Sequence, residues 1–166
     1  MKKSTILALL ALTLATCSEG GTIPSPLVRV DLSDKLPAKV QRRLRAADTG
    51  FECHRKVGLT SQGASQQFIV TWRVFEAETG VRYVTAVGVE TDGPFTGARA
   101  PSGTAVVEDP RPREGGGNAV RVRIQWQATK GCSSISARTV EQLDSQDPSC
   151  KPPKSGVKIF REPQQE

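Results

Sequence analysis

The stretch "FIVTWRVFEAETGVRYVTAVGV", residues 68–89, decides the fold class. Two runs in which apolar and polar residues alternate, 68–75 and 81–89, flank the segment "EAETG", where Gly80 can supply the left-handed backbone of a tight turn. If residues 77–80 form the loop, one face carries Phe68, Val70, Trp72 and Val74 opposite Val89, Val87, Thr85 and Tyr83. One mostly apolar face and one mixed face are what a half-buried antiparallel hairpin requires.

The same alternation recurs along the chain. In "AVRVRIQWQ", residues 119–127, the apolar side chains Val120, Val122, Ile124 and Trp126 are expected to point inward, and Arg121, Arg123, Gln125 and Gln127 outward. Further candidate strands are residues 26–32, 51–59, 104–107, 134–140 and 155–160. The chain is therefore expected to be rich in β-structure.

One segment has helical spacing instead. Leu36, Val40, Leu44 and Ala47 recur every three or four residues, Ser33 or Asp34 can cap the start, and Gly50 can end the helix. The pattern predicts an α+β fold, a predominantly antiparallel β-sheet with one N-terminal amphipathic helix packed on it. A β-sandwich with the helix as an accessory is the alternative.

Two segments are rich in glycine and proline: "TDGPFTGARAPSG" (91–103) and "EDPRPREGGGN" (108–118). Such residues are disfavoured inside strands, so both segments are expected to be long loops. Phe95 and Arg99 in the first loop are candidate recognition residues, because exposed loops on a rigid β-scaffold often carry binding contacts.

The first residues, "MKKSTILALLALTLATC", have the order of a secretion signal. Lys2 and Lys3 precede a short apolar run, 5–15, which falls well below the ~20 residues that span a bilayer. The chain is therefore expected to be exported.

Residues 14–17, "LATC", resemble the lipobox of bacterial lipoproteins, although Thr16 stands where that pattern usually has Gly, Ala or Ser. The resemblance implies a signal peptide over residues 1–16, a lipid on Cys17 and a membrane-anchored protein of the cell envelope, in the periplasm or at the outer membrane. Cleavage after Ala15 is the alternative, and it would give a soluble periplasmic or secreted protein.

The mature chain is expected to have a flexible tether over residues 17–26, a single β-rich domain over 27–161, and a disordered tail over 162–166. Loss of residues 1–16 removes two of the lysines that contribute to the net charge of +6, which leaves +4. This mild basic excess is compatible with anionic partners, and the exported location excludes nucleic acid.

The four cysteines are Cys17, Cys53, Cys132 and Cys150. An oxidising compartment permits disulfides, and the even count favours a Cys17 that is not acylated, since acylation would leave three thiols. A Cys132–Cys150 bond is predicted because these two residues flank a short polar segment; pairing of Cys53 with either of them is the alternative.

No residue pattern points to catalysis, a cofactor or a metal. The single histidine, His54, follows Cys53 in a predicted strand, so the two side chains should face opposite sides and cannot form a thiolate–imidazole pair. The sequence therefore predicts that the protein is not an enzyme.

Arginines are the remaining candidates for binding. Arg73 and Arg82 share the mixed face of the hairpin, and they would form one positive stripe with Arg121 and Arg123 if the strand at 119–127 lay beside it. Such a stripe suits carboxylates and phosphates. The predicted function is a non-catalytic envelope domain that binds a protein or an anionic envelope polymer. A secreted inhibitor or ligand-sequestering protein that acts through the 91–118 loops is the alternative.

Overall fold

The computed structural model describes residues 28–46 and 50–152. Its elements, in chain order, are β1 (Val28–Asp31), a 3-10 turn (Ser33–Lys35), α1 (Ala38–Ala46), β2 (Phe51–Ser61), β3 (Ala64–Glu78), β4 (Val81–Thr96), β5 (Arg99–Val107), β6 (Arg111–Pro112), β7 (Asn118–Lys130) and β8 (Ser133–Asp144). No helix within these ranges is long and apolar enough to cross a bilayer.

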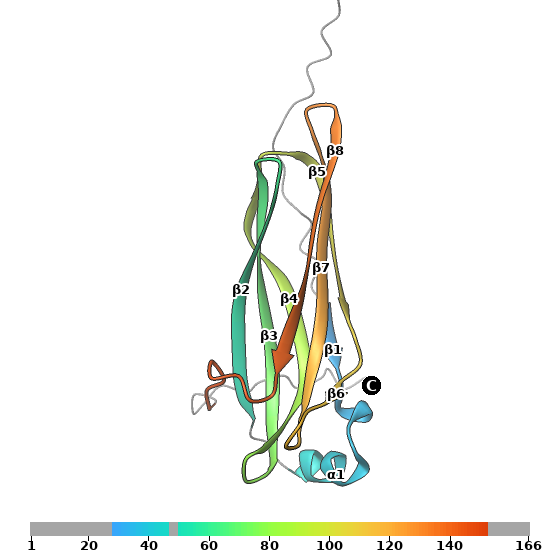
Figure 1. The fold of residues 1–166 in the computed structure, drawn as a ribbon, viewed down its shortest axis with the longest axis vertical. Coiled ribbons are helices and arrows are strands. Elements are labelled where there is room, and N and C mark those ends of the chain that lie inside the picture. The colour runs from blue at the N-terminus through green and yellow to red at the C-terminus, as the bar shows by residue number, and fades with distance from the viewer. Residues whose placement is uncertain (1–27, 47–49, 153–166) are drawn as a thin grey trace, which may run out of the picture.

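The strands form two antiparallel sheets that lie face to face along the length of the molecule (Figure 1). Sheet A has the order β1-β4-β3-β2. In sheet B, β7 is central; β5 and the short β6 pair with one edge of β7, and β8 pairs with the other. The predicted predominance of antiparallel β-structure is confirmed, and the sheets are arranged as in the alternative prediction of a sandwich.

The β3–β4 hairpin is present, and Gly80 has the expected left-handed backbone (φ 79°). Its register differs from the prediction by two residues, because Val70 pairs with Val89 and not with Val87. Irregularities at Arg73/Val74 and at Glu76/Glu78 insert the extra residues, as β-bulges do. Since side chains alternate with period two, Val70, Trp72, Val87 and Val89 still face the core. Closer to the turn, the irregularity places Val84 in the core in place of the predicted Tyr83.

The expectation of a loop at residues 91–103 is wrong. Residues 91–96 complete β4, and β5 begins at Arg99. Gly93 and Pro94 lie at an irregularity between the pairs Gln67↔Asp92 and Ser65↔Thr96, where no ladder hydrogen bond is required of proline. The segment at 108–118 fits the prediction better, because only β6 and the first residue of β7 interrupt it.

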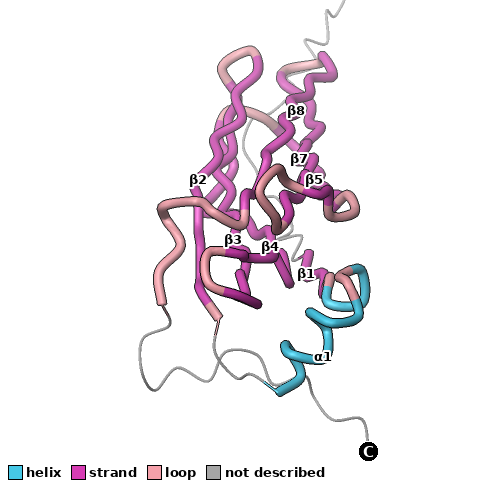
Figure 2. The backbone as a smooth tube through the Cα atoms, turned by 60° about the horizontal axis from the view of Figure 1, so that its bottom comes forward, coloured by secondary structure: helices cyan, strands magenta, loops and turns pink. Residues whose placement is uncertain are grey.

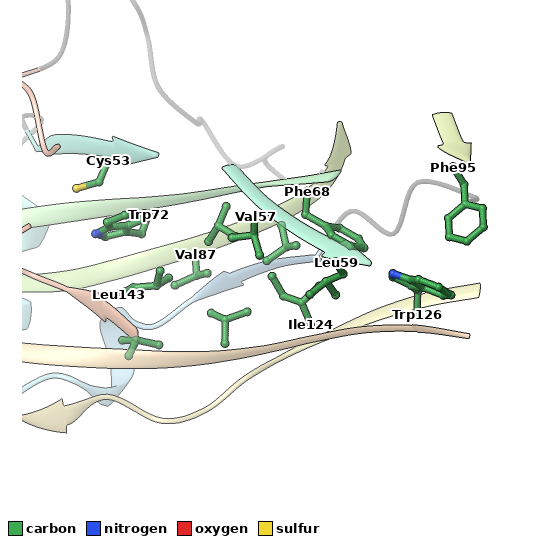
Figure 3. Close-up of a cluster of buried hydrophobic side chains, with 14 of the residues drawn as sticks. Cys53, Val57, Leu59, Phe68, Trp72, Val87, Phe95, Ile124, Trp126 and Leu143 are labelled. Carbon is green, nitrogen blue, oxygen red and sulfur yellow. The ribbon is translucent and has the colours of Figure 1, made fainter. Parts of the chain in front are cut away.

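The core lies between the two sheets and is built from alternate residues of each strand (Figure 3). Trp72 on β3 and Trp126 on β7 are almost fully buried. Phe95 is 3 % exposed, and its ring meets that of Trp126 edge-on, with centroids 4.8 Å apart. Phe95 lies on the same side of β4 as the buried Val87 and Val89, so the prediction of Phe95 as an exposed recognition residue is wrong.

Helix α1 lies at one end of the molecule, beyond the ends of the strands (Figures 1 and 2). Leu36 and Val40 are buried there against Phe75 of β3. Lys39 and Arg43 of the helix approach the Glu78 carboxylate at 3.1 and 3.4 Å. Their hydrogen bond and positive charge lower the pKa of Glu78. The helix thus closes one end of the β3–β4 hairpin.

Asn118 connects the two sheets through buried hydrogen bonds. The Val84 N–H of β4 donates to Asn118 Oδ1 at 2.6 Å, and Asn118 Nδ2 donates to the Val84 carbonyl at 3.4 Å. Val84 lies beside the bulge in the β3–β4 ladder, where the backbone is irregular. A side chain from the opposite sheet therefore satisfies a main-chain donor of the core.

Replacing Asn118 by alanine should lower the free energy of unfolding by about 1–3 kcal/mol, because the buried Val84 N–H loses its acceptor. Urea denaturation followed by tryptophan fluorescence measures this loss. Gln127→Ala is the matched control on the same strand, since Gln127 is exposed and its loss should cost less than about 0.5 kcal/mol. Equal effects of the two substitutions would contradict the role given to Asn118.

Candidate binding surface

A disulfide joins Cys53 of β2 to Cys150, 97 residues further along the chain, so the prediction of a Cys132–Cys150 bond is wrong. The reason is the length of β8, which separates the turn that holds Cys132 from the segment that holds Cys150. After β8 the chain passes beside β2, where Lys151 forms a two-way backbone bridge with Glu52. Cys132 is itself in a disulfide.

Beside this disulfide, Arg55 of β2 holds the two sheets together along one side. Its guanidinium lies 3.1 Å from the Glu141 carboxylate of β8 and 2.8 Å from that of Asp147. It also lies 5.5 Å from the centre of the Trp72 ring. Arg55 therefore has a structural role, and few of its N–H donors remain to bind a ligand.

The loss of folding stability at acidic pH should depend on Asp147. Burial alone would raise the pKa of its carboxyl, but hydrogen bonds from Ser149, one of them from the backbone N–H at 2.8 Å, and the charge of Arg55 together lower it. A carboxyl whose pKa is lowered by folding stabilises the protein above its unfolded pKa, and that contribution is lost as the pH falls through the folded pKa. Asp147→Asn should therefore flatten the loss of stability below about pH 4.

Thermal unfolding followed across this acidic range, for the wild type and for Asp147→Asn, provides the measurement. Asp109→Asn is the matched control, because the Asp109 side chain is 80 % exposed and its carboxylate lies 3.8 Å from Lys35 Nζ. This exposed ion pair should contribute little to stability. Identical acid limbs for wild type and Asp147→Asn would contradict the assignment.

His54 and Cys53 lie on opposite faces of β2, as predicted. Cys53 is buried in the disulfide, whereas His54 is exposed on the outer face of sheet A. Within residues 28–46 and 50–152, no group of three or more His, Cys, Asp or Glu residues is placed to hold a metal ion.

The predicted stripe of four arginines does not form. Arg73 lies on the outer face of sheet A, whereas Arg121 and Arg123 lie on the outer face of sheet B, because β7 does not pair with the hairpin. Arg82 pairs with Glu76 at 2.8 Å and lies over the Phe51 ring. Arg99 is exposed near the start of β5.

The outer face of sheet B is nevertheless a distinctive surface, which we call the arginine face. Its members are exposed residues of neighbouring strands that share one side of the sheet: Arg111, Arg121, Arg123, Arg138, Gln125, Gln127, Gln142, Val106 and Val140, with Arg113 beside them. Val106 and Val140 are the direct cross-strand partners of Arg123, and they are 49 % and 55 % exposed. Two apolar side chains therefore flank a guanidinium in one row.

Charge distinguishes this face from the outer face of sheet A. The arginine face has five arginines and three carboxylates. Glu108 and Asp144 pair with Arg111, Arg123 and Arg113, and Glu114 lies beside Arg113. Within the described part of the chain, Arg121 and Arg138 have no ion pair. The outer face of sheet A has Asp31, Glu52, Glu90 and Asp92 against Arg29, Lys56 and Arg73. Only the face of sheet B therefore has a net positive charge.

A groove deepens one end of the arginine face, with a volume of about 310 Å³. Its charged and polar lining residues are Arg111, Arg113, Glu114, Arg121, Gln142 and Asp144. Arg113 Nε donates to Asp144 Oδ2 at 3.0 Å. Three guanidinium groups around one groove can bind carboxylate or phosphate oxygens through paired N–H donors.

Comparison with known proteins adds no further information. No family model, curated protein or solved structure matches the chain. The functional argument therefore depends on the geometry and the charge of the surface.

The sequence analysis identified Arg121 and Arg123 but missed Arg111, Arg113, Arg138 and the two exposed valines. Alternation in residues 134–142 could have revealed Arg138 and Val140, since both fall on the side opposite the buried Ile135 and Leu143. Pairing of this strand with β7 is what places them beside Arg123 and Gln125.

Proposed function

We propose that the protein is an exported, non-catalytic domain that binds an acidic protein through the arginine face. The observation that carries the proposal is the pair of guanidinium groups of Arg121 and Arg138, which form no ion pair within the described residues and lie beside two exposed valines on the outer face of sheet B. Arginine is enriched at protein interfaces, and the valines supply apolar area that a purely solvated face does not need.

A protein partner fits this surface better than an envelope polysaccharide does. Binding of sugar rings usually uses exposed aromatic side chains, whereas the tryptophans and Phe95 are buried in the core. The outer face of sheet B instead offers guanidinium groups, whose paired N–H donors match carboxylates. The alternative of an inhibitor that acts through residues 91–118 loses Phe95 as a contact.

Export is part of the proposal, and it depends on the leader, which lies outside the described residues. The lipobox-like residues 14–17 would place a lipid on Cys17, whereas cleavage after Ala15 would leave its sulfur without a lipid. Both forms present the arginine face outside the cytoplasm. The intact mass of the mature protein distinguishes them.

The arginine face should bind a glutamate-rich peptide better than its glutamine-substituted counterpart. The double substitution Arg121→Glu and Arg138→Glu should weaken this binding about tenfold or more, and added salt should weaken it in the wild type. Fluorescence anisotropy of the labelled peptides measures both effects.

Arg73→Glu is the matched control, because it reverses a charge on the outer face of sheet A. It should leave the affinity unchanged. An equal loss from Arg73→Glu, or equal binding of the two peptides, would contradict the proposal.

A further inference from the structure

The groove at the end of the arginine face is built around a small residue. Ala119 of β7 lies on the outer face of sheet B, opposite Arg111 of β6 on one side and Asp144 of β8 on the other. The next four outward positions of β7, from 121 to 127, all have a long arginine or glutamine side chain. The short methyl group of Ala119 therefore leaves a hollow among longer side chains, and Ala119 lines the groove.

An ion pair crosses one end of the groove. Arg113 follows β6, and its Nε donates to Asp144 Oδ2 at 3.0 Å. Because β6 and β8 pair with opposite edges of β7, this ion pair joins the two sides of the groove across the start of β7. Backbone hydrogen bonds between Arg113 and residues 116–117 hold it in a turn. An extended chain that lies along β7 therefore ends in the groove and does not pass through it.

The charge of the lining favours a carboxylate over a phosphate. Three guanidinium groups and two carboxylates line the groove, so one positive charge is in excess. Asp144 already accepts from Arg113, whereas Arg121 has no ion pair within the described part of the chain. A carboxylate has a single negative charge, but a phosphate monoester has about −1.5 to −2 at pH 7. The groove therefore matches the charge of one carboxylate.

Arg121 and Gln142 supply the hydrogen-bond donors. They are direct cross-strand partners in the row next to Ala119, and both are exposed. The guanidinium can donate two parallel N–H bonds to a carboxylate, and the Gln142 amide can donate another. The volume of about 310 Å³ is at the small end of the range of roughly 300–1,000 Å³ for ligand pockets. It suits the last residue of a chain better than a long segment.

We propose that the groove binds the C-terminal carboxylate of the acidic partner protein. The inference rests on the proposed function, because the residues that precede the terminus lie along the rest of the arginine face. Arg138 pairs with Gln125, four residues beyond Arg121 along β7. An extended peptide advances by about the same distance per residue as the strand below it, so Arg138 faces acidic residues about four positions before the terminus.

Two labelled forms of one glutamate-rich peptide, a free C-terminal acid and a C-terminal amide, test the inference by fluorescence anisotropy. We expect amidation to weaken binding about tenfold or more, because Arg121 loses its charged hydrogen-bond partner. A third peptide, amidated but with one more internal glutamate, has the net charge of the free acid and should bind as weakly as the amide. Equal affinities of acid and amide, or full recovery by the third peptide, would overturn the inference.

Ala119→Leu gives a second readout, because it fills the floor of the groove without a change of charge. It should lower the affinity for the free acid to that for the amide. Ser134→Leu is the matched control, since it adds the same side chain to an exposed position at the far end of the same face, and it should keep the preference for the acid. Arg121→Gln removes the guanidinium without added bulk and should abolish the same preference, so the test does not depend on the folding of Ala119→Leu. An Ala119→Leu protein that folds and still prefers the acid would contradict the inference.

Arg138→Glu separates this inference from the proposed function. Arg138 does not line the groove, so reversing its charge should weaken the binding of the acid and of the amide by the same factor. If Arg138→Glu weakens both but the wild type binds acid and amide equally, the proposed function stands and the inference is wrong. If the wild type binds neither peptide, both are wrong.

Discussion

Replacing both Cys53 and Cys150 by serine should lower the free energy of unfolding by about 4–5 kcal/mol, the largest effect that we expect from any pair of changes. The bond joins residues 97 positions apart. In the chain-entropy model, closing a loop of about 100 residues stabilises the folded state by roughly 4.7 kcal/mol, because the unfolded chain loses conformations. Urea denaturation of the wild type and the double variant measures the difference.

A matched control is the substitution Ser136→Ala, which leaves the cross-link intact on an exposed position of β8. It should change the free energy of unfolding by less than about 0.5 kcal/mol. If the cysteine variant unfolds at the same urea concentration as the wild type, the proposed contribution of the Cys53–Cys150 bond is wrong.

Trp126→Ala should cost about 3–5 kcal/mol, since it removes a fully buried indole and leaves a cavity between the sheets. Trp126 is the only described tryptophan on sheet B, and the Phe95 ring meets it edge-on. The same denaturation experiment applies, with circular dichroism as the signal because a tryptophan is removed.

A double-mutant cycle with Phe95→Leu tests the ring contact itself. The coupling between the two positions should be about 0.5–1.5 kcal/mol, the range of edge-to-face aromatic pairs. Additive effects would show that the two rings contribute only through the area that each buries.

The local elements of this fold follow from the sequence better than their pairing does. Period-two alternation identifies β3, β4, β7 and β8, and it states correctly that Trp72 and Trp126 are buried. It does not predict which strands are neighbours, because a strand shows the same alternation whether the chain forms one sheet or two. The chain crosses from sheet A to sheet B between β4 and β5, and no local pattern marks that crossing.

Bulges and disulfides are further features that a single sequence does not reveal. The glycine and proline of residues 93–94 are typical of a loop, yet they form an irregularity within β4, and the strand continues past them with Phe95 in the core. Proximity along the sequence favoured Cys132 as the partner of Cys150, yet an extended strand separates them. Both errors arise because tertiary contacts decide the outcome.

The candidate surface was only partly predictable, because alternation gives the side of a strand but not its neighbours. Arg121 and Arg123 fall on the polar side of β7 by alternation alone. Their neighbours Arg138 and Val140 come from β8, and only the register of the β7–β8 hairpin brings them into one surface. Arg73 and Arg82 are not part of the arginine face, because their strands belong to sheet A.

Site-specific photo-crosslinking in cells that naturally produce the protein tests the central claim most directly. A photoreactive residue at Val140 on the arginine face should crosslink to a protein, and Arg121→Glu with Arg138→Glu should abolish the product. The same residue at Thr71, exposed on the outer face of sheet A, should give none. Equal crosslinking from Thr71, or a Val140 product that survives charge reversal, would contradict the assignment of the arginine face as the binding surface.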